Sequence, residues 1–216
     1  MAGILAIWND IDPEGYAHFE RWYNREHLHE RVGVPGFKFG QRYELLSGGD
    51  RRFFAFYEVD SPAVLTSPAY LQRLENPTPW TQKTMTFFRG MVRTVCDLRR
   101  TEGNLAGSFA VVLRVDGAFE PTTAADALVD ELAGQDGIAR VQLWTAAASQ
   151  TKADTAEMKI RGKDQLIAGA LVVECVRYAD AERVAASLGK STVAGLGISG
   201  PATLGIYGLL CIATPA

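Results

Sequence analysis

The sequence predicts an α+β protein made of two tandem units, each with the element order βαββαβ. Two observations predict this. Strand-like and helix-like segments follow the same order in both halves, and residues of the same kind recur at a spacing of 101 around the first hairpin. The matched pairs are Gly36 and Gly137, Phe37 and Ile138, Gln41 and Gln142, and Tyr43 and Trp144. We therefore expect a duplication, with units over residues 1–103 and 104–216.

The elements of the first unit follow from local signals. Asp12 and Pro13 form a helix N-cap and first helical position directly after an apolar run. A turn at Ser47, Gly48 and Gly49 separates two alternating apolar stretches, which is typical of a β-hairpin. The predicted elements are a strand at 4–8, a helix at 13–31, strands at 37–46 and 53–59, a helix at 61–75 and a strand at 91–98.

The second unit repeats this order with one difference. A polar insert over residues 149–164, rich in Lys, Asp and Thr, replaces the tight hairpin turn, and we expect it to be a mobile loop. The predicted elements are a strand at 108–115, a helix at 121–134, strands at 138–147 and 165–176, a helix at 179–188 and a strand at 203–213.

Composition excludes several classes of protein. The chain is 47% hydrophobic with a formal net charge of −3, and its basic residues are spread out, so we expect no nucleic-acid partner and no membrane partner. Cys96, Cys175 and Cys211 are far apart within apolar runs, which indicates reduced thiols in a cytoplasmic protein. The N-terminal apolar run is short and has no basic leader or small-residue cleavage site, so we expect neither a signal peptide nor a transmembrane segment.

The first predicted helix carries the ionisable groups that point to chemistry. On a wheel of about 100° per residue, one face holds aromatic residues in its first half and Glu26, His27 and Glu30 in its last turns. Charges on a buried face must be bonded, solvated or shifted in protonation. We therefore expect a cavity between this helix and the sheet. The full face comprises Tyr16, Phe19, Tyr23, Glu26, His27 and Glu30.

The second half serves as an internal control. At the same spacing of 101, packing residues replace the polar set: Ala124, Ala127, Leu128 and Leu143 stand opposite Tyr23, Glu26, His27 and Arg42. All three histidines lie within the first 29 residues, so acid-base chemistry near neutral pH is confined to the first unit. We expect a functional pocket there and a mainly structural second unit.

Each candidate residue has a functional and a structural interpretation. His27 is either the proton-transfer group or a histidine bonded to a carbonyl at the helix end. Arg42 either pairs with Glu26 or holds a substrate oxyanion, and Glu30 is matched by Glu131, which favours a structural role. The candidate catalytic residues are His27, Tyr23 and Arg42, and the candidate substrate-binding residues are Trp8, Asp10, Glu26, Tyr43, Trp80 and Phe88.

Several motifs resemble the EthD-like branch of the dimeric α+β barrel superfamily. Trp8, Asn9 and Asp10 match the Trp-x-Asp pattern that ends a strand in that branch. Residues 22–30 match its helix pattern Trp-Tyr-x-x-Glu-His-x-Pro-Glu, except that His29 stands where the pattern has Pro. Residues 77–81 match a signature that comes later in the chain. The resemblance covers about residues 3–95. It implies ferredoxin-like units whose antiparallel sheets pair into a barrel, between two chains or within one, with pockets between sheet and helices. Relatives include cofactor-free monooxygenases, isomerases, dehydratases, haem-degrading enzymes and chlorite-dismutase-like proteins.

The favoured function is a cofactor-independent lyase or isomerase acting by acid-base chemistry on a small hydrophobic substrate, aromatic or polyketide-like. The alternatives are a cofactor-free monooxygenase and a non-catalytic small-molecule-binding or stress-related protein. A metal site at Glu26, His27 and Glu30 is a third option with little support, and we expect neither metal nor cofactor. A homodimer is one assembly that the sequence allows.

Overall fold

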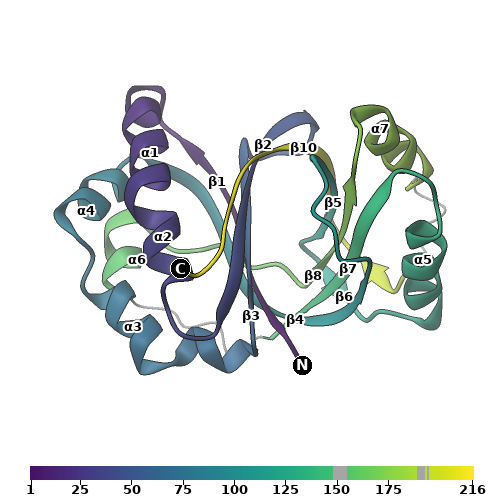
Figure 1. Cartoon of the computed structure of the whole chain (residues 1–216), viewed down its shortest axis with the longest axis horizontal. Coiled ribbons are helices and arrows are strands. Elements are labelled where there is room, and N and C mark those ends of the chain that lie inside the picture. Colours follow the sequence, from purple (N-terminus) through teal and green to yellow (C-terminus); the bar gives the residue numbers. More distant parts are fainter. Residues whose placement is uncertain (148–154, 189–192, 194) are drawn as a thin grey trace.

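Eight antiparallel strands close into a barrel, and helices lie outside it on two sides (Figure 1). The computed structural model describes residues 1–147, 155–188, 193 and 195–216. Around the barrel the strands follow the order β1, β3, β2, β10, β5, β8, β7, β4. No helix in these residues is both long enough and apolar enough to span a membrane.

The first unit contains the expected βαββαβ order, with one additional helix. Strand β1 pairs with both β3 and β4, so the four strands of this unit are ordered β4, β1, β3, β2, as in a ferredoxin-like unit. The elements are β1 (Gly3–Ile11), α1 (Tyr16–Trp22), a π turn (Tyr23–His27), α2 (Leu28–Val32), β2 (Phe37–Gly48), β3 (Phe53–Val59), α3 (Pro68–Glu75), α4 (Pro79–Met85) and β4 (Phe88–Glu102).

The second unit has the equivalent order of its four long strands, which is β10, β5, β8, β7. Its elements are β5 (Phe109–Val115), β6 (Ala118–Phe119), α5 (Thr123–Ala133), β7 (Ile138–Ala146), α6 (Ala156–Arg161), β8 (Gly169–Cys175), α7 (Tyr178–Ser187), β9 (Ile198–Ser199) and β10 (Ala202–Ala213). The glycines before β2 and β7, Gly36 and Gly137, both have positive φ, at 93° and 81°, so both turns need a residue without a Cβ.

The two units close the barrel within one chain. Strand β2 of the first unit pairs with β10 of the second, and β4 of the first pairs with β7 of the second. The two seams use the same pair of positions in each unit, which gives the barrel an approximate two-fold arrangement. The expected fold class, two tandem ferredoxin-like units whose antiparallel sheets pair into a barrel, is therefore confirmed.

The barrel interior is packed with aromatic and aliphatic side chains around a buried carboxylate, Glu174. Its carboxylate accepts hydrogen bonds from Gln41 Nε2 at 3.1 Å and from Tyr43 Oη at 2.9 Å, and it forms an ion pair with Arg140. Because Gln41 and Tyr43 lie on β2 while Glu174 and Arg140 lie on β8 and β7, these bonds join the two units across the interior.

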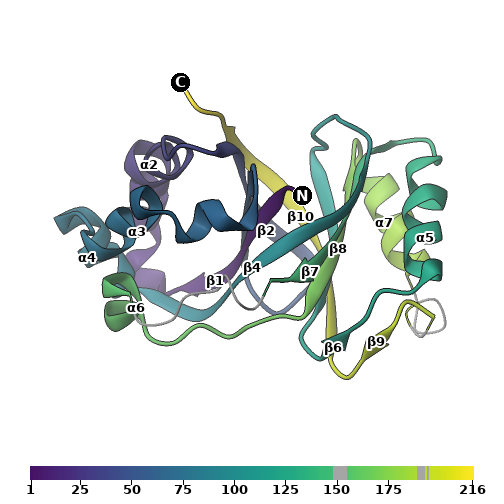
Figure 2. The same cartoon turned by 90° about the horizontal axis from the view of Figure 1, so that it is seen from below.

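The helices form two layers of different origin. Helices α5 and α7 cover the second unit's sheet, whereas α1 to α4 cover the first, and α6 lies beside α3 and α4 although it belongs to the second half (Figure 2). The expectation of a mobile loop over residues 149–164 is therefore wrong for residues 156–161, which form a packed helix. Residues 149–154 of that insert lie outside the described residues.

Candidate functional site

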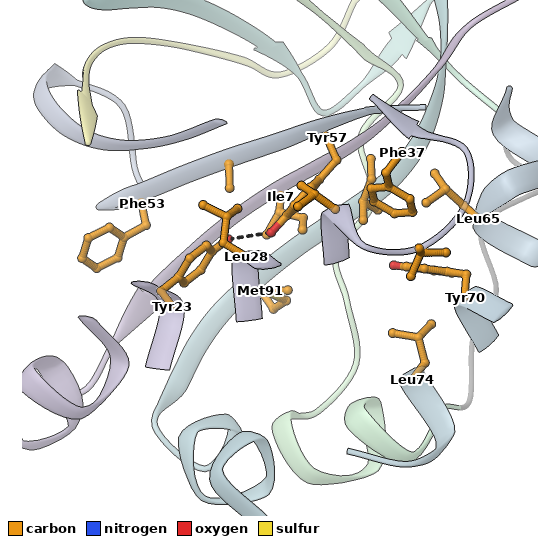
Figure 3. Packing of buried hydrophobic residues seen from close by; sticks show 14 of the residues in the cluster. Ile7, Tyr23, Leu28, Phe37, Phe53, Tyr57, Leu65, Tyr70, Leu74 and Met91 are labelled. Atoms are coloured by element: carbon orange, nitrogen blue, oxygen red, sulfur yellow. Dashed lines mark hydrogen bonds between the residues drawn. The ribbon is translucent and has the colours of Figure 1, made fainter. Parts of the chain in front are cut away.

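A small cavity of about 30 Å³ lies between the first unit's sheet and its helices. Figure 3 shows Tyr23, Tyr57, Tyr70, Leu74 and Met91 around this region, coming from the first helix, the sheet and α3. The wall is formed by Leu5, Ile7, Asn9, Trp22, Tyr23, His27, Arg31, Tyr57, Tyr70, Leu74, Met85, Phe88, Met91, Arg93, Glu157 and Arg161.

The π turn at Tyr23–His27 determines which residues of the first helix reach this cavity. A π turn holds one more residue than an α-turn, so the buried face moves on by one position after it. His27 and Arg31 are buried, whereas Glu26 and Glu30 are only half-buried. The regular wheel predicted Glu30 on the inner face, and the π turn places Arg31 there instead.

His27 is held in place by packing against aromatic rings. Its ring stacks on Trp22 with the centroids 4.1 Å apart, and its side chain is 6% exposed. The Nδ1 atom is buried and has no hydrogen-bond partner among the described residues. Burial, followed by the charges of Arg31, Arg42 and Arg161, lowers the pKa of His27 well below 6.5. The imidazole is therefore neutral near pH 7 and has a nitrogen free for a ligand.

The lowered pKa of His27 predicts a loss of stability in acid. Below a pH of about 6.5 the unfolded chain protonates this histidine and the folded chain does not, so the free energy of unfolding falls by about 1.4 kcal/mol per pH unit until the folded pKa is reached. Urea denaturation of the wild type and His27→Leu at several pH values measures this term. We expect a flatter dependence in His27→Leu, and an identical dependence in both proteins would contradict it.

Two tyrosines supply hydroxyl groups beside His27. The hydroxyls of Tyr23 and Tyr57 lie 3.4 Å apart, and the rings of Tyr23 and His27 meet edge to face at 5.0 Å. Burial raises the pKa of Tyr23 and raises that of Tyr57 well above 10.0. Both phenols therefore stay protonated near neutral pH, where they can donate hydrogen bonds to a bound molecule.

Three arginines complete the polar part of the wall. Arg31 forms a buried ion pair with Glu157, and Arg161 pairs with Asp164 through its Nη2 at 3.0 Å from Oδ2 and also through its Nη1. Arg93, 6% exposed, donates from Nη2 to the Tyr70 hydroxyl at 2.9 Å. The wall is therefore basic and rich in donors.

Helix α6 closes the cavity from outside. Glu157 and Arg161 belong to this helix, and the following segment is fixed to β4, where Gln165 N donates to Met91 O at 2.8 Å. An engineered protein cavity of about 150 Å³ holds benzene, and that volume is several times the one present here. A molecule with a ring can therefore enter only when α6 or a side chain of the wall moves.

Of the nine predicted site residues, Tyr23, His27 and Phe88 line the cavity together. Arg42 is fully buried and forms an ion pair with Glu20, not with Glu26. Its guanidinium carbon lies 4.4 Å from the centroid of the Tyr23 ring. Arg42 also lines a separate shallow hollow, together with Cys211. Glu26 accepts hydrogen bonds from the hydroxyls of Thr78 and Thr81 at 2.6 and 3.0 Å.

The other four predicted residues lie elsewhere. Trp8 and Tyr43 are in the barrel interior, where Trp8 stacks on Phe54 at 4.9 Å. Asp10 accepts a hydrogen bond from the backbone of Arg52 at 2.7 Å, and Trp80 lines an open surface hollow. Trp8 ends up inside because β1 alternates, and the outer face of that strand takes Ile7 and Asn9.

The polar wall contains six residues that the sequence did not single out: Arg31, Tyr57, Tyr70, Arg93, Glu157 and Arg161. Strand alternation could have placed Tyr57 and Arg93 on the helix-facing side of their strands. No local pattern indicates that Glu157 and Arg161 cross from the second half to cover the first.

The layer under α5 and α7 in the second unit differs in polarity. The side chains that pack between these helices and their sheet are apolar: Val111, Leu113, Ala125, Val129, Leu132, Val141, Leu143, Leu171, Val173, Ala181 and Val184. In the residues described, no three His, Cys, Asp or Glu side chains group as a metal site would require. Glu30 lies instead near Arg73, at 3.6 Å.

Comparison with known proteins shows the fold alone. No family model matches the chain, and no curated protein matches it in sequence. An anthrone oxidase-like protein is similar in structure, with 10% identity, 98% of this chain and 92% of that chain covered, and a TM-score of 0.62. A proposed monooxygenase from Fusobacterium nucleatum is 11% identical, with 99% of this chain and 94% of that chain covered and a TM-score of 0.56. Another from Lactobacillus acidophilus is 8% identical, with 99% of this chain and 97% of that chain covered and a TM-score of 0.54. The chain thus has a dimeric α+β barrel fold, closed within a single chain.

Proposed function

We propose that the chain is a cofactor-free enzyme that removes a proton from a small, hydrophobic, aromatic or polyketide-like molecule at the cavity beside His27. The observation that supports this is a buried, neutral imidazole whose Nδ1 has no partner within the described residues, in a wall of tyrosines and arginines. A histidine with a structural role would be bonded there.

The roles of the wall residues follow from their contacts. His27 accepts the proton as general base. The hydroxyls of Tyr23 and Tyr57 bond each other at 3.4 Å, so one O–H of the pair stays free to donate to the oxygen of an adjacent carbonyl as negative charge develops on it. Phe88 and Trp22 provide apolar contact for a ring. Return of the proton to another atom gives an isomerase, and loss of a leaving group gives a lyase.

The family branch and the division of roles between the two units are proposed from the sequence. The motifs around Trp22, His27 and Trp80 support placement in the EthD-like branch. We assign the functional pocket to residues 1–103 and a mainly structural role to residues 104–216, apart from α6, whose Glu157 and Arg161 complete the pocket. A homodimer stays a prediction.

Oxygenation is the second candidate, and the names of the similar structures favour it, since two are proposed monooxygenases and one is anthrone oxidase-like. The first step is the same. The carbanion left by proton removal then gives electrons to O₂, so that a CH₂ group becomes a carbonyl, and the second oxygen atom leaves as water with the two hydrogens.

A single screen separates these outcomes. Aromatic ketones, anthrones and phenolic polyketides are incubated with the full chain under air and under nitrogen, in D₂O, and analysed by mass spectrometry. Deuterium uptake or loss of a leaving group in both atmospheres, with no gain of oxygen under air, supports the isomerase or lyase. A gain of one oxygen with loss of two hydrogens, only under air, supports the oxygenase. Binding of these compounds without any mass change would contradict both and indicate a binding protein.

A further inference from the structure

Among the described residues, the arginines of the cavity wall carry one positive charge more than the carboxylates paired with them. Arg31 is paired with Glu157 and Arg161 with Asp164, and Glu30, which is not part of the wall, lies near Arg73. Arg93 is as buried as His27, yet within the described ranges its side chain forms no direct ion pair and donates only to the neutral hydroxyl of Tyr70, while Asp164 and Glu157 favour its charged form from farther away. A buried guanidinium without a direct ion pair is costly, and an anion beside it offsets part of that cost.

The same wall contains donors with nothing to bond. Arg31 Nη1 and Arg161 Nε are buried and lack a hydrogen-bond partner among the described atoms. Both residues line the cavity. One carboxylate oxygen, from Glu157, already lies on Arg31, which shows that the wall accepts oxygen of this type. Unused buried N–H groups beside an excess cation are the features of an oxyanion site.

We propose that this cavity binds the oxyanion of a small planar organic acid, a carboxylate or a phenolate, with Arg93 balancing its charge and Arg31 Nη1 donating to its oxygen. The inference rests on the proposed function and specifies its substrate class as acidic. A bound anion also offsets the guanidinium charges around His27 and so makes the imidazole a stronger base when the substrate is present.

Binding can be measured without turnover, because the chain has only three histidines and their NMR signals can be assigned with His27→Leu. The full chain is titrated with formate, which suits the small cavity, with benzoate, and with benzamide, the neutral analogue of benzoate. We expect formate and benzoate to shift the His27 signal and benzamide to bind at least 10-fold more weakly, because it lacks the charge. 4-Nitrophenol tests whether the site takes a phenolate, because its ionised form is yellow. A gain of yellow colour on binding would show that the site binds the phenolate form.

Arg93→Gln removes the excess charge without leaving a described carboxylate unpaired, and glutamine can still bond Tyr70. It should weaken benzoate binding roughly 10- to 100-fold. Arg99→Gln, the same change at an exposed position of β4 paired with Asp126, is the matched control and should bind like the wild type.

The two ideas fail in different ways. Three results would each overturn the oxyanion site. The wild type could bind benzoate and benzamide equally, a folded Arg93→Gln could bind benzoate as tightly as the wild type, or the His27 signal could respond to none of the probes. The comparison of benzoate with benzamide uses only the wild type, so it stands even if Arg93→Gln does not fold. The proton-transfer function fails separately, if His27→Leu keeps full turnover.

Discussion

Replacing His27 with leucine should lower kcat by about 10²- to 10⁴-fold, the usual contribution of a positioned acid-base group. The fold should survive, because the ring is held by stacking on Trp22 and its Nδ1 bonds no described atom. Removing a buried polar atom without a partner costs little or is favourable. Turnover and melting temperature are measured on the same purified variant.

His29→Leu is the matched control, since His29 is an exposed histidine two residues away on the same helix. It should leave kcat unchanged. If His27→Leu keeps its turnover while its melting temperature falls, His27 is a structural residue and the proposed site is wrong.

Glu174→Leu should destabilise the protein by about 3–5 kcal/mol, because it leaves Arg140 as an uncompensated charge inside the barrel. It also removes the acceptor that Gln41 and Tyr43 of the first unit share across the interior. Urea denaturation at pH 7 measures the change in the free energy of unfolding.

The double variant Glu174→Leu with Arg140→Met separates charge from packing. It removes both charges together, and we expect it to recover most of the lost stability, as is common when a buried pair is replaced by apolar residues. A single variant as stable as the wild type would show that the network does not join the two units.

The fold could be predicted because both units have strong periodic signals. The hairpin of Phe37–Gly48 and Phe53–Val59 lies within two residues of the expected strands, and Gly36 and Gly137 occupy equivalent turns. The short helix Pro79–Met85 was missed because the prolines at 77 and 79 read as punctuation, although Thr78 caps the helix through Thr81 N at 3.0 Å.

The site was harder to predict, for two physical reasons. The π turn moves the helix face by one residue, so a regular wheel includes Glu30 and omits Arg31. The second reason is long-range: the pair of Arg31 with Glu157 spans 126 positions of sequence, and nothing local in the insert points to the first unit. Tyr23 and His27 were found because they are the first and last residues of the turn, and the face shifts only after it.

The most direct test of the account is a crystal structure of the full chain with a compound that the screen identifies, soaked in under nitrogen. The account predicts the compound in the first unit, between His27 and Arg93, with α6 displaced to make room for it. A compound bound only against residues 121–144 of the second unit, with the cavity beside His27 still closed, would contradict it.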